Sequence, residues 1–351
     1  MSLDTKRASF SVSQARELVD DLFEYNAWFV WADLFLTLAV GYGFGAVYLG
    51  AAPFSLLQVA SFFVAGFALF RVGSSIHDVT HMRRKMAGFR VAWNLLCGIP
   101  LLMPSFFYDT HLQHHNSHSY GRHDDGEYLP MGVGPVAGIF WFFAQVPVMP
   151  LYIVTRFLIS PLTYLHPRLR LWVLEHCSSF VINFRHRRAV AASAPRRMWA
   201  LMETACFLRA AVLIAVVALG IRPWTRLLLM YLLATFVLSL NYIRTLAAHH
   251  YRNNGGQMTF LEQLDDSVNI TGHWFWTELF FPVGLRYHAL HHLLPSLPYH
   301  NLGKAHRRLM EKLPADSPYR RTVYASYWTV VRELWTDARN SQSEKLPAVA
   351  A

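Results

Sequence analysis

"AWFVWADLFLTLAVGYGFGAVYLGAAPFSLLQVASFFVAGFALF", residues 27–70, decides the fold of this 351-residue chain. It consists of two apolar runs joined at Ala51 and Ala52. An α-helix needs about 20 apolar residues to cross the hydrocarbon core of a bilayer. Both runs are long enough, and the short link between them predicts a hairpin that crosses the membrane twice. Asp33, the single charged residue of the stretch, is expected at the membrane surface because it lies near the polar flank.

A second pair of apolar runs repeats this arrangement, with the pentapeptide RPWTR at residues 222–226 between them. Over the whole sequence 54% of residues are hydrophobic and 15% are charged, whereas soluble domains carry about 25% charged residues. We therefore expect an all-α integral membrane protein with four transmembrane helices in two hairpins. The expected spans are residues 27–50, 53–72, 203–221 and 227–248.

Two other apolar stretches are less suited to crossing a membrane. Residues 87–104 carry Arg90, and residues 134–159 contain Pro147 and Pro150. A charge or a proline interrupts a spanning helix. We expect both stretches to lie in the interface or to be re-entrant.

The distribution of arginine and lysine predicts the orientation of the chain. The turn at 51–52 has no basic residue, whereas residues 82–90 and 164–200 are rich in arginine. Basic loops stay on the cytoplasmic side, so both long connections and both termini are expected there. A net charge of +10 then reflects cytoplasmic loops near anionic lipid, and we do not expect a nucleic acid partner.

The chain divides into three parts. Residues 1–25 form a cytoplasmic amphipathic segment in which Ser11 and Gln14 have the spacing of a capping box. Residues 26–310 form the membrane domain, and residues 311–351 form a cytoplasmic tail. The three cysteines contain no CxxC pair, so we expect neither a disulfide framework nor a cysteine metal site.

The 18 histidines of the chain are concentrated in four places. These are HDVTH at 77–81, HLQHH at 111–115, HHY at 249–251 and HALHH at 288–292. Spacings of three and four residues place imidazoles on one face of a helix. The expected topology puts all four places on the cytoplasmic side, where they can converge on one site. Imidazole is a suitable ligand for iron, zinc, copper or nickel.

The number of imidazoles indicates two metal ions rather than one. His250 points about 100° away from His249 around a helix, and we favour His249 as the ligand. A lone HxxxH helix is more often a solvated surface, but two HxxHH boxes on the same side are hard to explain in that way. A non-enzymatic alternative is a histidine-rich metal transporter or sensor, which would need polar residues inside its spans. The predicted ligands are His77, His81, His111, His114, His115, His249, His288, His291 and His292.

HDVTH, HLQHH and HALHH, in this order around two apolar hairpins, resemble the histidine boxes of membrane fatty acid desaturases and hydroxylases. "RYHALHHLLPSLPYHNL" at 286–302 is similar to the third box of bacterial acyl desaturases, and the resemblance covers about residues 30–310. It implies a non-haem centre of two iron ions, O₂ as the oxidant, and a fatty acid or fatty acyl substrate. It also implies external electrons, from a partner such as ferredoxin with its reductase, and a location in the inner membrane of a bacterium.

Residues near the boxes are expected to support the metal ligands. An all-histidine ligand set is neutral, so nearby acids must offset the metal charge, although DDGEY at 124–128 could equally be a surface turn. In related acyl-CoA desaturases an asparagine one helical turn before the extra histidine helps to hold the second metal through water. Thr245 stands at that position here. The expected supporting residues are Asn241, Asn269, Asp109, Asp125, Asp266 and His300.

We expect desaturation of the acyl chain as the reaction, although the resemblance does not separate it from other oxidations known on this architecture. Two alternatives are oxidative decarboxylation of a free fatty acid to a 1-alkene and hydroxylation of an acyl chain or alkane. No side chain is assigned as a catalytic acid or base. A free acid would need a cation near the iron, and the candidates for this contact with the substrate headgroup are Arg244, Arg252 and Arg286.

Overall fold

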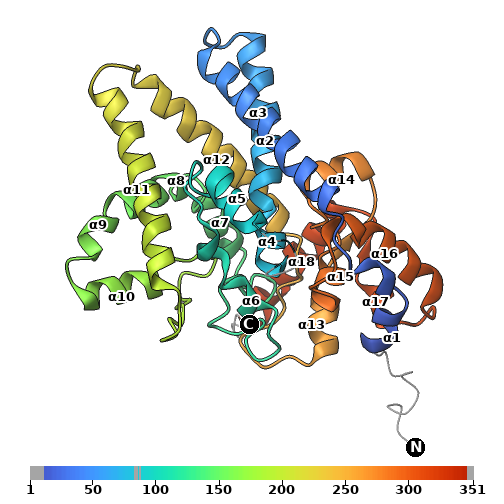
Figure 1. The fold of residues 1–351 in the computed structure, drawn as a ribbon. Helices are drawn as coiled ribbons and strands as arrows, with labels where there is room; N and C mark the ends of the chain where they lie inside the picture. Colours follow the sequence, from blue (N-terminus) through green and yellow to red (C-terminus); the bar gives the residue numbers. More distant parts are fainter. Residues whose placement is uncertain (1–11, 83–85, 87, 346–351) are drawn as a thin grey trace, which may run out of the picture.

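The computed structural model describes residues 12–82, 86 and 88–345, and this part of the chain is mostly helical (Figure 1). The two 3₁₀ turns are η2 (Asp20–Leu22) and η4 (Ser105–Tyr108), and η3 (Asn94–Gly98) is a π turn. The α-helices are α1 (Val12–Glu17), α2 (Ala27–Gly50), α3 (Leu56–Ser74), α4 (Ile76–Met82), α5 (Phe89–Trp93), α6 (His111–His114), α7 (Ala137–Ala144), α8 (Met149–Leu158), α9 (Ser160–Thr163), α10 (Pro167–His176), α11 (Arg196–Ala218), α12 (Thr225–Thr245), α13 (Phe260–Asp266), α14 (Trp274–Phe280), α15 (His288–Leu293), α16 (Tyr299–Lys312), α17 (Pro318–Arg321) and α18 (Tyr327–Lys345).

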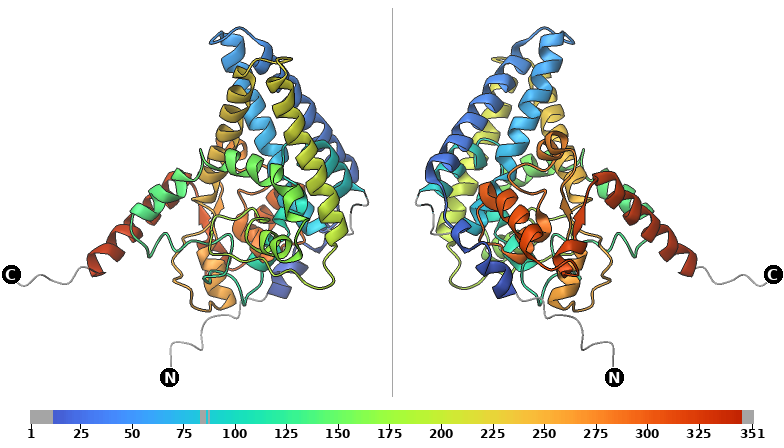
Figure 2. Two further views of the ribbon diagram at one scale, coloured as in Figure 1. Left: turned by 90° about the vertical axis from the view of Figure 1, so that its left-hand side faces the viewer. Right: turned by 90° about the vertical axis from the view of Figure 1, so that its right-hand side faces the viewer.

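Four long helices, α2, α3, α11 and α12, are long and apolar enough to cross a membrane. They extend together from one side of a cap of shorter helices (Figures 1 and 2). The side chains of Asn26 and Ser55 accept hydrogen bonds from the first turns of α2 and α3, which fixes where these helices begin. Compared with the predicted ranges 203–221 and 227–248, α11 begins earlier and α12 ends earlier.

The second long helix leads directly into the cap. Only Ser75 separates α3 from α4, and Leu56–Met82 counts as one apolar stretch. Gly66 allows α3 to pack closely on α12, because a Cβ atom there would lie 2.3 Å from Cδ1 of Phe236. The first histidine box is thus attached rigidly to a candidate span.

The two interrupted apolar stretches do not form straight helices. Within the predicted range 134–159, α7 and α8 are bent by 47° at the break that contains Pro147, as in a broken span or a re-entrant loop. Within 87–104, the short α5 is followed by the π turn η3.

The cap contains more ordered structure than the sequence suggests. β1 (Asn269–Ile270) pairs in parallel with β2 (Val323–Tyr324), a small ladder in a chain expected to be all-α. The predicted tail 311–351 includes α17 and α18, and Val330, Leu334 and Ala338 of α18 are fully buried. These three residues recur every four positions and give α18 an apolar face that packs against the cap. Ser11, predicted to cap the first helix, lies outside the described residues.

Asp33 is part of a polar link between four helices. Its carboxylate accepts hydrogen bonds from Arg71 of α3 at 3.0 Å and from the hydroxyl of Tyr299 of α16 at 2.7 Å. Arg71 also forms an ion pair with Glu278 of α14 at 3.4 Å. The link therefore fastens the cap to the two N-terminal candidate spans.

Candidate metal centre

Four separate segments bring the predicted ligands together. His77 and His81 lie on α4, and His111 and His114 lie on α6, whose C-cap is His115. The third box forms the short helix α15. His249 follows α12 in an extended segment that bridges to Ser267, because α12 has already ended at Thr245.

The nine predicted ligands form two groups, each of which could hold a metal ion. Within each group, one ligand atom from every residue lies within 4.8 Å of the others. We call them the five-histidine group and the four-histidine group. The first contains His77, His81, His111, His115 and His291, and the second contains His114, His249, His288 and His292.

The ring nitrogens face one another through their Nε2 atoms. In the four-histidine group, Nε2 of His249 lies 3.2 Å from that of His114 and 3.0 Å from that of His288. In the five-histidine group, Nε2 of His115 lies 2.9 Å from that of His111 and 3.0 Å from that of His291. Two nitrogens that share a metal ion at about 2.1 Å each are roughly 3 Å apart, so this spacing fits ligation.

Burial favours the neutral, metal-binding form of these rings. Seven of the nine predicted ligands lie outside the candidate spans. In six of them, burial and neighbouring positive groups, mostly histidines, lower the imidazole pKa well below its usual range. The exception is His114: burial acts to lower its pKa, but the neighbouring carboxylate of Asp125 raises it overall. Among the described residues, the buried Nε2 of His77 has no hydrogen-bond partner. A buried nitrogen without a partner is costly, and a metal ion would satisfy it.

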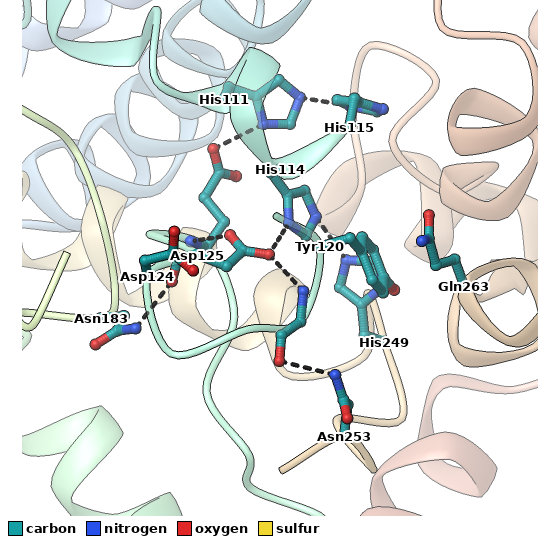
Figure 3. A network of polar contacts seen from close by, with 12 residues as sticks. His111, His114, His115, Tyr120, Asp124, Asp125, Asn183, His249, Asn253 and Gln263 are labelled. Carbon is teal, nitrogen blue, oxygen red and sulfur yellow. Dashed lines mark hydrogen bonds and ion pairs between the residues drawn. The ribbon is translucent and has the colours of Figure 1, made fainter. Parts of the chain in front are cut away.

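Buried acidic and phenolic groups orient the four-histidine group (Figure 3). Nδ1 of His114 donates to Asp125 at 2.8 Å, and this carboxylate is fully buried. The hydroxyl of Tyr120 lies 2.8 Å from Nδ1 of His249 and donates to Asp266 at 2.9 Å. A hydrogen bond at Nδ1 fixes the tautomer that leaves Nε2 free to bind a metal.

Glu127 has the same role in the five-histidine group. Nδ1 of His111 donates to Oε1 of Glu127 at 2.7 Å, and the hydroxyl of Tyr108 donates to Oε2 at 3.0 Å. Burial raises the pKa of Glu127 to about 7. The segment DDGEY is therefore not a simple surface turn, because two of its acids point inward at histidines of different groups.

The two asparagines have structural contacts. Oδ1 of Asn269 accepts from the backbone N–H of Leu290 in α15, while its amide donates to Thr322 beside β2. Asn269 thus positions the third box through the backbone. Oδ1 of Asn241 accepts from the guanidinium of Arg244.

The three arginines expected near a substrate headgroup differ in their surroundings. Arg286 is buried and donates to backbone carbonyls, including Ile270 at 3.0 Å and Thr271 at 2.7 Å. Arg252 is half exposed and pairs with Asp337 of α18 at 2.7 Å. The guanidinium groups of both residues are therefore committed to structural contacts. Arg244 is buried and close enough to lower the pKa of His249 and His288.

Two of the expected supporting residues contact other parts of the chain. Asp109 forms an ion pair with Arg90 at 2.8 Å. Nε2 of His300 accepts from the backbone N–H of Asn26 at 3.1 Å, at the start of α2. These two side chains thus contact Arg90 and the start of α2.

His250 belongs to neither group. Its Nε2 lies 3.2 Å from the hydroxyl of Tyr324, which donates to Glu333. The sequence predicted this divergence from a helical projection, but both residues follow the end of α12, and the extended backbone at His249 directs the two side chains apart.

Sequence reasoning missed Tyr120 and did not select Glu127. Glu127 follows Asp125 by two residues in an acidic segment, which was a usable signal. Tyr120 had no such signal, because a single tyrosine among 16 says nothing about the histidine it will contact.

Two comparisons with known proteins agree with this geometry. The family model described as "Fatty acid desaturase" matches residues 53–324. The chain belongs to the fatty acid desaturase family. It is also 39% identical over 338 residues to a ceramide hydroxylase of Caulobacter vibrioides (strain NA1000 / CB15N). The matched region covers 94% of this chain and 95% of that protein.

Membership of this family makes the protein a membrane oxidoreductase that acts on a lipid. The predicted histidine-box resemblance is thereby confirmed. The comparisons give no support to a decarboxylase that forms 1-alkenes, since neither name refers to that reaction.

Proposed function

We propose that this protein uses O₂ to hydroxylate an unactivated C–H bond in a ceramide-type lipid. The observation that carries the proposal is the convergence of nine imidazoles in two groups. The sequence alone had led us to expect desaturation. Similarity to a ceramide hydroxylase along nearly the whole chain favours hydroxylation instead.

The nine histidines would hold two iron ions, one in each group. The donor set fits, because imidazole nitrogens suit iron and buried acids offset part of its charge. Iron would supply the activation of O₂, which side chains alone do not provide. The protein would orient the imidazoles, exclude water and present the lipid chain.

Hydroxylation consumes one O₂, two electrons and two protons for each C–H bond converted to C–OH, and it releases one water. The electrons must come from a separate protein, such as ferredoxin with its reductase. We infer that the histidine groups and both termini face the cytoplasm at the bacterial inner membrane, because the arginine-rich stretch 164–200 adjoins the cap.

The test combines metal analysis with product analysis in one preparation. Protein purified in lipid nanodiscs, with and without added ferrous iron, is assayed for bound metals. It then receives ceramide, a ferredoxin and reductase pair, NADPH and ¹⁸O₂. Mass spectrometry distinguishes a product that gains one ¹⁸O atom from one that loses two hydrogens.

We expect two irons per chain and a product that carries ¹⁸O. A product with only a new double bond would establish a desaturase and contradict hydroxylation. Bound zinc with no turnover, even after iron reconstitution, would contradict the oxidase itself. Free fatty acid and acyl thioester in place of ceramide test the substrate class.

A further inference from the structure

Helix α14 (Trp274–Phe280) exposes three consecutive aromatic side chains. Trp274 is 74% exposed, Phe275 53% and Trp276 62%. Consecutive residues are 100° apart around a helix, so these three rings cover more than half of its circumference. An exposed apolar patch of this kind marks a contact with a protein or a membrane.

The position of α14 places these rings beside the candidate spans. The ring of Phe280 lies 5.5 Å from that of Phe67 in α3, and α14 also packs against α12. Figures 1 and 2 show α14 on the side of the cap from which the long helices extend. One turn before Phe67, Phe63 is itself 46% exposed on α3. The exposed surface of α14 is thus continuous with the outer surface of a helix that is apolar enough to span a membrane.

Polar contacts hold the helix in this position. Glu278 pairs with Arg71 of α3, which also pairs with Asp33 of α2. The loop that enters α14 is braced by Arg286, whose guanidinium donates to the carbonyls of Thr271 and Gly272 at 2.7 and 3.4 Å. These contacts anchor α14 against the protein, while Trp274, Phe275 and Trp276 remain largely exposed.

We propose that α14 is seated in the bilayer, with Trp274, Phe275 and Trp276 in contact with lipid at the boundary between headgroups and acyl chains. Tryptophan is enriched at this boundary because its ring is apolar and its N–H is polar. The proposal adds a membrane contact in a region where the sequence predicts no span, namely after Tyr251. Since Arg286 lies two residues before His288, the lipid contact would also fix the depth of the third histidine box.

The experiment measures the depth of a spin label at position 275. Phe275→Cys is made with Cys177→Ser, since the other cysteines, Cys97 and Cys206, are fully buried. Matched labels at Leu36→Cys, 68% exposed on α2, and at Glu311→Cys, exposed on α16, mark the bilayer and water. The protein is reconstituted in phosphatidylethanolamine and phosphatidylglycerol vesicles.

Power saturation measures how strongly a reagent enhances the relaxation of the label. It compares the accessibility of the label to O₂, which concentrates in lipid, with its accessibility to water-soluble chromium oxalate. We expect the ratio at position 275 to shift away from the value at 311 toward the value at 36. A ratio equal to that at 311 would overturn the proposal. Trp276→Cys repeats the measurement if Phe275→Cys does not fold.

Dilution with unlabelled protein tests the other occupant, a second copy of this chain. Spin–spin broadening that disappears on dilution would place a second copy on α14 and overturn the lipid contact, whereas an unchanged spectrum supports it. No readout here depends on turnover, so the result stands apart from the proposed hydroxylation.

Discussion

The two histidine groups differ in the number of imidazoles and in what supports them. The five-histidine group is supported through Glu127, whose side chain is 20% exposed. The four-histidine group has one imidazole fewer, but Asp125 and Asp266 beside it are almost completely buried. The group with fewer ligands thus has the more deeply buried acidic support. We infer that its metal ion depends more on each remaining contact.

The largest expected effect comes from removing a ligand of the four-histidine group. His249→Ala leaves three imidazoles, and we expect the bound metal to fall by one ion per chain. Turnover should fall by more than the roughly 10–100-fold that is typical when an outer partner of a ligand is lost. His250→Ala is the matched control, because the ring of His250 belongs to neither group although it is adjacent to His249 in sequence. Equal metal loss in both variants would contradict the assignment.

Asp125→Asn should weaken the same group without removing a ligand. The amide cannot balance charge at Nδ1 of His114, so we expect about 10–100-fold weaker metal binding, measured by competition with a chelator. Glu127→Gln should cost less, since its more exposed side chain is partly solvated. A larger effect of Glu127→Gln would contradict the inference that the four-histidine group depends more on its acidic support.

Tyr120→Phe should have a smaller effect. The ring keeps its stacking on His114, at 5.1 Å between centroids, but the hydrogen bonds to His249 and Asp266 are lost. We expect a loss of about tenfold in metal affinity with an unchanged circular dichroism spectrum. Binding equal to that of the original protein would show that Tyr120 only fills space.

A separate effect concerns the stability of the metal-free protein, not its metal binding, and applies to both groups. Six imidazoles have folded pKa values below the ordinary 6.5, so the unfolded chain binds more protons as the pH falls below that value. Stability is therefore present above about pH 6.5 and is lost below it, by up to about 1.4 kcal/mol per pH unit for each proton taken up.

Three groups oppose this trend. Burial raises the pKa of Glu127 to about 7 and that of Asp266 to about 6, and the carboxylate of Asp125 raises the pKa of His114. They are fewer than the six imidazoles. We expect the thermal unfolding midpoint of chelator-treated protein to decrease as the pH is lowered from about 7 to about 5. A midpoint that rises on acidification would show that these three groups dominate.

Much of the candidate site could be predicted because its ligands follow local periodicity. HDVTH, HLQHH and HALHH each place their imidazoles on one helical face, and all of them join the two groups. The supporting residues were harder to predict. Asp125 and Asp266 contact the site as expected, whereas Arg286 and Arg252 make structural contacts instead, since sequence proximity to a box does not set the direction of a long side chain.

The sequence by itself determined the helical membrane architecture and the identity of the nine imidazoles, because hydrophobic length and helical spacing are local properties of the chain. Only the tertiary structure decided which imidazoles belong together. His114 and His115 are adjacent in sequence but lie in different groups, as do His291 and His292. Adjacent helical side chains diverge by about 100°, so the second and third boxes each contribute to both groups, whereas both imidazoles of the first box join the five-histidine group. That division depends on how four distant segments pack.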